Sequence, residues 1–226
     1  MSTLVEPRND HDLQTAVHDE LEWTPDVDSA GIGVAVENGV VTLSGDVDDY
    51  SESVAARRAA QRVRGVTTLI NALKVQPTAP WPVTEAAVAE EIEHALSWST
   101  LVPDTVKASV DGHKVTLTGT VVWNFQREAA KKAVQHLRGV YIVENDITLT
   151  KRPSATDAVE RIRKALTRNA TLDASRITVT VEDHELTLTG NVRSYAEKEQ
   201  ARQAAWASPH VSSVDNRLKV TPVLFD

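Results

Sequence analysis

One sequence pattern occurs three times along this chain, and it restricts the possible folds more than any other feature. The pattern Leu-x-Gly-x-Val places a glycine at three positions that are 74 and 71 residues apart (119 − 45 = 74 and 190 − 119 = 71): Gly45, Gly119 and Gly190. Asparagines recur at the same two offsets: Asn71, Asn145 and Asn216. A repeat of this length is longer than a solenoid unit and long enough for a small domain. The chain is therefore predicted to be a tandem array of three similar domains.

The composition is that of a folded protein without cysteine chemistry. Hydrophobic residues make up 41% and charged residues 25% of the chain, proportions that differ from those of disordered sequences. The absence of cysteine excludes disulfides and thiolate metal ligands. The first residues carry acidic groups and lack the apolar segment of a secretory signal, and no apolar run approaches the ~18 residues of a membrane span. We therefore expect a cytoplasmic protein without a transmembrane segment.

Negative charge is concentrated in the first repeat. The net charge of the chain is −8, and residues 1–77 contain 13 acidic and 6 basic groups, whereas residues 153–226 contain 10 of each. Phosphate binding relies on neutralisation by Lys and Arg, so an acidic first repeat disfavours nucleic acid and anionic lipid there. No nucleic-acid partner is expected, and an anionic partner is expected to contact the third repeat.

Each repeat shows the same order of predicted elements. Apolar residues at helical spacing indicate an opening helix: Leu13, Val17 and Leu21; Val88, Ile92 and Leu96; Val159, Ile162 and Leu166. Two segments of alternating apolar residues follow, joined by short turns such as Asn38-Gly39, which favours a tight hairpin. An alanine-rich helix and a last strand complete the unit. The predicted fold class is α+β, with three α-β-β-α-β sandwich domains, each a three-stranded sheet with two helices on one side.

The repeated glycine lies late in the second predicted strand, just before the alanine-rich helix. In the first repeat, Ala56, Ala59 and Ala60 give this helix a face of small residues. A glycine within a strand indicates a bend or the close approach of another backbone. We therefore expect the alanine face to lie close against the sheet at the glycine.

The predicted domain limits follow from these elements and from the proline-containing segments between them. The prediction is an N-terminal tail at 1–10, domains at 11–76, 83–150 and 155–221, linkers at 77–82 and 151–154, and a C-terminal tail at 222–226. Proline-rich linkers are semi-rigid, so the domains are expected to hold preferred orientations. Trp81, in the first linker, is expected to pack between domains.

Taken together, the glycine motif, the alanine-rich helix and the strand with the repeated asparagine resemble the BON domain in three copies, over about residues 12–220. The third copy departs from the pattern at Pro209-His210-Val211, where the others have a Gly-Val step. The resemblance implies a non-enzymatic bacterial protein linked to osmotic or envelope stress. It also implies phospholipid binding, chaperone-like protein contacts or, as in a cytoplasmic relative with an added LysM domain, potassium sensing. This chain shows no LysM unit, and no cofactor is expected.

The first candidate binding residues are two tryptophans at matching positions. Trp23 and Trp98 lie two residues beyond the last apolar residue of their opening helices, and Arg168 takes this place in the third repeat. Indole rings at a helix end suit a membrane interface, where the ring is buried and the N–H stays hydrated. In some BON relatives the opening helix is the lipid-facing element. The alternative is that both rings cover the sheet edge or an adjoining domain.

The second candidate surface is the basic face of the third opening helix. Arg161, Lys164 and Arg168 share one face at helical spacing, which suits headgroup phosphates. Asp157 and Glu160 precede the first two of these by four residues, the favourable order for ion pairs within a helix. The alternative is therefore a solvated face whose charges pair within the helix.

No catalytic or metal-binding set recurs in the repeats. His11 and His18 lie near carboxylates but lack a compact ligand motif, so no metal site is expected. His113 and His184 occupy matching turns, where exposure explains them without chemistry. The repeated asparagines have no recurring acid, base or nucleophile beside them, and are expected to bond backbone groups at a bend or strand end. We therefore do not expect an enzyme.

These observations predict a peripheral adaptor or chaperone-like protein. It would bind phospholipid headgroups or protein partners through the opening helices and the faces between domains. The alternative is a cytoplasmic module that senses potassium or another small ion, in which ion binding changes the orientation of the domains.

Overall fold

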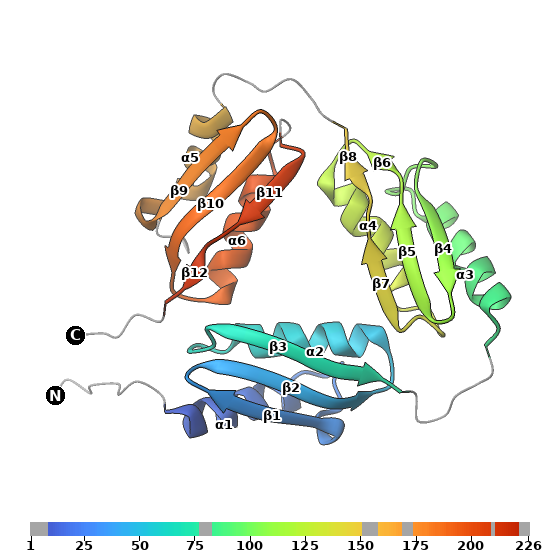
Figure 1. The fold of residues 1–226 in the computed structure, drawn as a ribbon, viewed down its shortest axis with the longest axis horizontal. Coiled ribbons are helices and arrows are strands. Elements are labelled where there is room, and N and C mark those ends of the chain that lie inside the picture. Colours follow the sequence, from blue (N-terminus) through green and yellow to red (C-terminus); the bar gives the residue numbers. More distant parts are fainter. Residues whose placement is uncertain (1–8, 77–82, 151–157, 169–173, 209–210, 222–226) are drawn as a thin grey trace.

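The computed structural model describes residues 9–76, 83–150, 158–168, 174–208 and 211–221, and these form three α+β domains (Figure 1). The first contains α1 (Asp10–Glu22), β1 (Ile32–Glu37), β2 (Val40–Val47), α2 (Tyr50–Arg62) and β3 (Thr68–Val75). The second contains α3 (Glu85–Trp98), β4 (Lys107–Asp111), β5 (Lys114–Thr118), β6 (Thr120–Val121), α4 (Asn124–Val134), β7 (Ile142–Asn145) and β8 (Thr148–Leu149). The third contains α5 (Ala158–Arg168), β9 (Ile177–Glu182), β10 (Glu185–Val192), α6 (Tyr195–Trp206), β11 (Ser213–Asn216) and β12 (Lys219–Val220). Short 3₁₀ turns, η1 (Ser29–Gly31) and η2 (Ala174–Arg176), precede β1 and β9.

All three domains have the same strand topology, in which the second strand is central; in the second domain this strand is itself divided into β5 and β6. In the first domain β1 pairs with β2 antiparallel, and β2 pairs with β3 parallel. The parallel pairing requires a crossover, and α2 supplies it. In the second and third domains the last strand is divided into two short pieces, β7 and β8 or β11 and β12, each parallel to the strand beside it. The predicted α-β-β-α-β order is confirmed.

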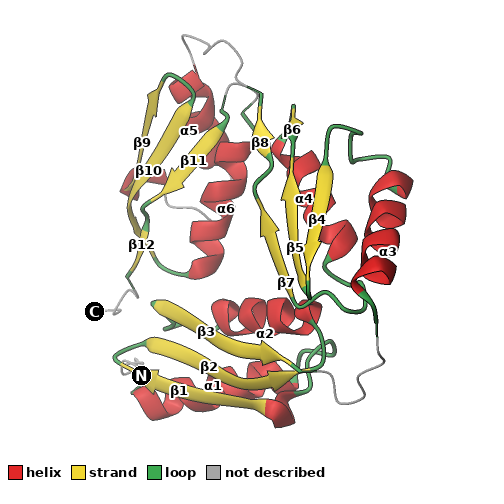
Figure 2. Ribbon diagram, turned by 45° about the vertical axis from the view of Figure 1, so that its right-hand side comes forward, coloured by secondary structure: helices red, strands yellow, loops and turns green. Residues whose placement is uncertain are grey.

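In each domain two helices lie against the sheet (Figure 2). Each domain has its own hydrophobic core. The opening helices of the first two domains bury the predicted stripe, with Leu13, Val17 and Leu21 no more than 2% exposed in the first, and in the third Ile162 is buried. The central strands contribute Leu43, Leu117 and Leu188, which are equivalent and 0% exposed. Burying side chains of this size contributes about 1.5–3 kcal/mol each, so each domain gains its own hydrophobic stabilisation. No helix in the described ranges combines the length and apolar character needed to cross a bilayer.

The repeated glycine is required by a backbone contact different from the one expected. Gly45, Gly119 and Gly190 all have positive φ, at 119°, 127° and 124°. A Cβ at Gly119 would lie 2.2 Å from the carbonyl oxygen of Thr105, which is two residues before the first strand of that domain. The carbonyls of Gly31 and Arg176 occupy the same place in the other domains. The segment leading into the sheet, and not the alanine face of the helix, therefore excludes a side chain here.

The repeated asparagines join the last strand of each sheet to the second helix. The Asn145 amide donates to the carbonyl oxygen of Arg127 on α4 at 2.9 Å, and its Oδ1 accepts from the backbone N–H of Ile147 at 3.3 Å. Asn216 makes the same pair of bonds in the third domain, and Asn71 bonds the Ser53 hydroxyl in the first. The Asn145 side chain forms hydrogen bonds with backbone groups at the break between β7 and β8. The strand is therefore interrupted without leaving these polar groups unpaired.

Side-chain caps fix the start of the second helix in the first and third domains. Asp49 accepts from the N–H of Glu52, as its capping spacing predicts, and Ser194 accepts from Glu197. The Glu52 carboxylate is buried and accepts from the backbone N–H groups of Asp28 and Asp48 at 2.7 and 2.8 Å. This side chain therefore ties the segment before β1 to the entrance of α2.

The three domains surround a common centre, and each turns the same elements towards it. Figure 1 shows the last strands and the second helices α2, α4 and α6 on the inner side, with the opening helices α1, α3 and α5 on the periphery. Contacts between α2 and α6 join the first domain to the third, although they are distant in sequence. The segments predicted as linkers, with Trp81, lie outside the described residues.

Candidate functional site

Both candidate tryptophans project away from the protein. Trp23 caps the C-terminus of α1 and is 85% exposed, and Trp98 ends α3 and is 78% exposed. The Trp98 ring lies 5.2 Å from the ring of His94, one helical turn earlier. Neither indole covers a sheet edge or an adjoining domain, so the packing alternative is wrong for both residues. Two large aromatic side chains at equivalent helix ends are therefore free to contact a partner.

One cation of the basic face of α5, Lys164, is paired within its own helix. Lys164 Nζ lies 3.7 Å from the Glu160 carboxylate, the i,i+4 pair that the sequence predicts, and Arg163 lies 4.0 Å from the same group. Asp157 and the side chain of Arg161 lie outside the described part of the chain. Arg168 is exposed, and no ion pair to it occurs among the described residues. Of the two described cations of this face, Lys164 and Arg168, it is Arg168 that has no ion pair.

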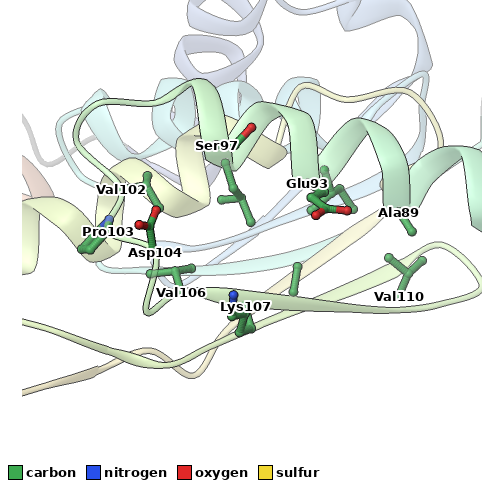
Figure 3. A pocket seen from close by; sticks show the side chains of 12 residues that line it. Ala89, Glu93, Ser97, Val102, Pro103, Asp104, Val106, Lys107 and Val110 are labelled. Atoms are coloured by element: carbon green, nitrogen blue, oxygen red, sulfur yellow. The ribbon is translucent and has the colours of Figure 1, made fainter.

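A groove of about 410 Å³ lies between α3 and β4, on the outer side of the second domain (Figure 3). Apolar side chains such as Val106 and Val110 line its sheet side, and Glu93, Asp104 and Lys107 stand at its rim. Two carboxylates against one ammonium disfavour a phosphate group at this rim. The groove therefore does not extend the tryptophan surface as a headgroup site.

Aromatic residues at the start of the second helices carry contacts between domains. Tyr50, the first residue of α2, packs against the core of the second domain, where Lys131 Nζ lies 5.8 Å from its ring centroid. Tyr195, the first residue of α6, packs against the core of the first domain. The equivalent position in α4 is Asn124 (50 + 74 = 124 and 124 + 71 = 195), which lines a cavity shared with Trp206 of α6. Each second helix thus directs its N-terminus at another domain, and the three contacts close a head-to-tail ring.

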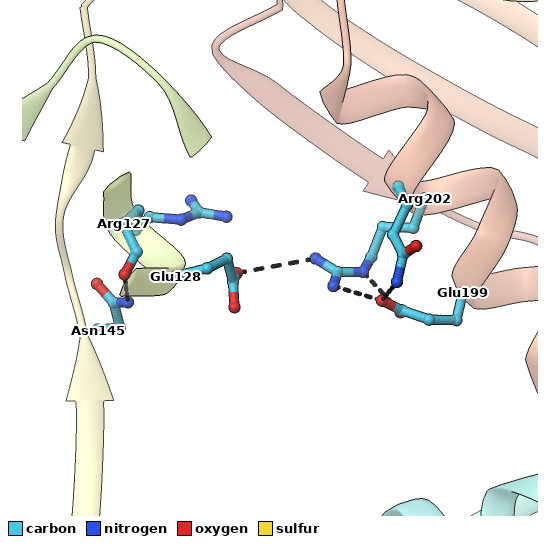
Figure 4. Close-up of polar contacts among 6 residues, drawn as sticks. Arg127, Glu128, Asn145, Glu199 and Arg202 are labelled. Carbon is cyan, nitrogen blue, oxygen red and sulfur yellow. Dashed lines mark hydrogen bonds and ion pairs between the residues drawn. The ribbon is translucent and has the colours of Figure 1, made fainter. Parts of the chain in front are cut away.

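Charged contacts join the second domain to the third (Figure 4). The Arg127 guanidinium lies 4.7 Å from the centroid of the Trp206 ring, within the range of cation–π attraction. Burial lowers the pKa of Arg127; Glu128 opposes this shift and Arg202 adds to it. Arg202 donates two hydrogen bonds to Glu199 at 2.7 and 2.8 Å and lies 4.0 Å from Glu128 across the interface.

The pair of Arg202 and Glu199 is partly buried at this interface, and each partner shifts the other. The hydrogen bond to Glu199 holds the pKa of Arg202 above its ordinary value. Burial favours a higher pKa for Glu199, but the bonds and charge of Arg202 outweigh burial and lower that pKa. Arg58 of the first domain also contributes to this lowering. The carboxylate of α6 is therefore held in its charged form by cations from two domains.

A cavity of about 510 Å³ opens where α2, α4 and α6 meet, and its lining is mainly basic. Six cationic and two anionic side chains line it: Arg57, Arg58, Arg62, Lys131, Lys132 and Arg202, with Glu128 and Glu199. Arg57, Lys131 and Arg202 occupy one and the same position of the repeat (57 + 74 = 131 and 131 + 71 = 202). The sequence carried this signal, a cation recurring at one position of the alanine-rich helix, but only the ring arrangement shows that the three copies converge.

Two of the histidines considered in the sequence, His18 and His113, make local contacts. His184 differs from the expected exposed turn residue, because it is half-buried and its Nδ1 is buried without a hydrogen-bond partner among the described residues. His18 lies 3.5 Å from Glu22, and with Asp19 these side chains form an exposed group near the end of α1. Exposed acidic groups of this kind are common on helices without a metal. The His113 ring stacks on Tyr141 at 4.0 Å, and its Nδ1 lies 2.9 Å from the Gly139 carbonyl oxygen, which fixes the hairpin against the end of α4.

Comparison with known proteins agrees with this architecture. The family profile of the BON domain matches residues 9–77, 84–151 and 154–222, so the chain belongs to the BON family. The chain is 31% identical over 126 residues to osmotically-inducible protein Y of Escherichia coli K12, an alignment that covers 54% of this chain and 63% of that protein.

Two solved structures align over most of the chain with low similarity. The C-terminal domain of CdsD, a structural protein of the type III secretion system of Chlamydia trachomatis, is 13% identical, with 95% of this chain and 100% of that chain covered and a TM-score of 0.26. The periplasmic domain of PrgH, a type III secretion inner-membrane protein of S. typhimurium, is 13% identical, with 84% and 95% covered and a TM-score of 0.23. Scores this low do not establish a shared arrangement of domains.

Proposed function

We propose that this protein is a non-enzymatic bacterial adaptor that attaches peripherally to phospholipid through the helix ends carrying Trp23 and Trp98. The observation that carries this proposal is the exposure of both indole rings, 85% and 78%, at equivalent positions of two domains. Trp is enriched at membrane–water interfaces because its ring is apolar and its N–H remains hydrated. Interfacial contact would bury both rings without changing the fold.

We propose that both tryptophans are used together, because they lie at equivalent ends of α1 and α3 within one molecule. Two anchors on one rigid body bind more tightly than either alone, because the second contact is intramolecular. Arg168, at the third such position, adds electrostatic attraction to anionic headgroups, worth about 1 kcal/mol per basic residue near the surface.

The relative named above supports a role in stress. Osmotically-inducible protein Y of Escherichia coli is, by its name, induced by osmotic change, and the aligned region covers 63% of that protein. We propose that this chain also acts under osmotic stress, when membrane and protein surfaces need transient binding partners. Attachment through two rings and one arginine would be reversible, as such a role requires.

Flotation with liposomes tests the proposal. The wild-type protein is expected to float with anionic vesicles at low salt and less at high salt, and its tryptophan emission is expected to shift to the blue. Trp23→Ser with Trp98→Ser should abolish flotation, and Arg168→Glu should weaken it. Ile70→Ser is the matched control, because Ile70 is a large exposed apolar residue, 49% exposed, on β3.

The outcomes separate lipid binding from protein binding at the same surface. If Ile70→Ser floats with the vesicles and the variant with both Trp23→Ser and Trp98→Ser does not, the result supports lipid binding through the two tryptophans. Failure of the wild type to float on any vesicle contradicts lipid binding. Flotation that the double variant retains contradicts the tryptophan site.

A further inference from the structure

The central cavity has an excess of positive charge that the protein itself does not neutralise. Both of its carboxylates, Glu128 and Glu199, interact with Arg202, and Arg62 bonds Glu20 at 2.7 Å. Within the described ranges no ion pair to a carboxylate is found for Arg57, Lys131 or Lys132, and Arg58 acts on Glu199 only through its charge, without a salt bridge. The Nε of Arg57 is buried and has no hydrogen-bond partner there. A buried donor left in this way is costly unless a ligand or water accepts from it.

This concentration of charge is local and runs against the charge of the chain. The net charge is −8, and residues 1–77 contain only 6 basic groups. Three of these, Arg57, Arg58 and Arg62, line the cavity. The cations of α2 and α4 that line the cavity repel one another. This repulsion opposes closure of the ring, and an anion bound in the cavity would remove it. The acidic net charge of the first domain therefore does not reveal the local positive charge at the cavity.

We propose that the cavity binds a small multivalent oxyanion of the phosphate class, which Arg57 and Arg58 of α2 and Lys131 and Lys132 of α4 hold together. Guanidinium groups present a planar set of donors that matches phosphate oxygens, and lysines add point charges. A volume of about 510 Å³ suits one or two phosphate groups with a small organic part. The acidic remainder of the chain disfavours a long polyanion.

Such a ligand would act on the arrangement of the domains. Its contacts come from at least two domains, so it binds the closed ring and not separated domains. Mass action then stabilises the closed ring as the anion concentration rises. The cavity differs from the tryptophan surface in position and in chemistry, so either assignment can fail while the other stands.

Titration calorimetry of the full chain with sodium pyrophosphate, inorganic phosphate and sulfate tests the proposal, with sodium chloride at equal ionic strength as the blank. We expect saturable binding of one pyrophosphate per chain. Arg57→Glu and Lys131→Glu should each weaken binding at least tenfold, and Arg57→Gln should weaken it less. Lys74→Glu is the matched control, since it makes the same charge change at an exposed position on β3 outside the cavity.

The source of the phosphate group is distinguished in a second arm with phosphatidic acid vesicles. If Arg57→Glu abolishes vesicle binding, pyrophosphate competes for it and Lys74→Glu leaves it intact, the ligand is a lipid headgroup and the proposal stands. If pyrophosphate binds and vesicle binding does not depend on Arg57, the ligand is a free phosphate compound and the proposal also stands. Absence of saturable binding in both arms, or equal loss in Lys74→Glu, overturns it. Circular dichroism of each variant confirms that it is folded.

Discussion

The guanidinium of Arg127 lies 4.7 Å from the centroid of the Trp206 ring, and this contact joins the second domain to the third. The backbone of Arg127 is held within its own domain, because its carbonyl oxygen accepts a hydrogen bond from the Asn145 side-chain amide at 2.9 Å. A repeated structural asparagine thus holds the backbone of the residue whose side chain reaches across the interface. Arg127 therefore takes part both in the hydrogen bond to Asn145 within its domain and in the contact with Trp206 of the third domain.

Trp206→Ala is expected to loosen the ring without unfolding the domains. The cation–π contact contributes about 0.5–2 kcal/mol. Its loss, with the packing of the ring, should increase the radius of gyration measured by small-angle scattering, while circular dichroism stays close to that of the wild type. Trp98→Ala, which removes a 78% exposed indole, should leave the radius unchanged. An unchanged radius in both variants would show that this contact does not hold the domains together.

Gly119→Ala should be severely destabilising. The substituted residue would keep a φ of 127°, and its Cβ would lie 2.2 Å from the Thr105 carbonyl oxygen. Backbone strain alone costs about 1–3 kcal/mol, and the clash adds to it, so we expect a loss above about 3 kcal/mol in urea denaturation. Gly112→Ala is the control in the same domain, since Gly112 also has positive φ, 58°, but no atom lies within 4 Å of a Cβ there. It should cost about 1–2 kcal/mol; equal losses would refute the role of the carbonyl.

Glu52→Ala is expected to destabilise the first domain by about 2–3 kcal/mol, because two part-buried hydrogen bonds from backbone N–H groups lose their charged acceptor. These are the N–H groups of Asp28 and Asp48. Glu52→Gln keeps one acceptor oxygen and should cost less. Denaturant unfolding of both variants measures the difference. If the two variants are equally stable, the carboxylate does not hold the segment before β1.

Acidification should weaken the contact between the first and third domains, because the charge of Arg58 in the first domain acts on Glu199 of α6. The pKa of Glu199 is lowered in the folded protein, so its stabilising contribution is present above the unfolded value, about 4.3, and is lost as the pH falls through the folded value. Small-angle scattering between neutral pH and pH 3 should show the ring opening below about pH 4. Glu199→Gln should show an expanded radius already at neutral pH and a smaller further change. A wild-type radius independent of pH would contradict this account.

The repeat and its local chemistry made most of each domain predictable from the sequence. The alternation that includes Leu43, Leu117 and Leu188 identified the central strands, and all three are fully buried. Asn38 and Gly39 have the positive φ values that their turn requires. These features depend on neighbours a few residues apart, and such relationships can be read from spacing alone.

Features that depend on distant contacts were not predictable in this way. The carbonyl that excludes a side chain at Gly119 belongs to Thr105, 14 residues earlier (119 − 105 = 14), and the sequence does not show that the two meet. The exposure of Trp23 and Trp98 depends on where the neighbouring domains lie. The central cavity depends on the closure of the ring, although Arg57, Lys131 and Arg202 already recurred at one position.

Quenching of tryptophan fluorescence by lipids that carry bromine near the headgroup tests the central claim most directly. The chain contains 5 tryptophans, and the claim is that two of them enter the membrane interface. Anionic vesicles of brominated lipid should quench the wild-type emission, and Trp23→Phe with Trp98→Phe should remove most of this quenching. Absence of quenching in the wild type, or equal quenching in the double variant, would contradict the account.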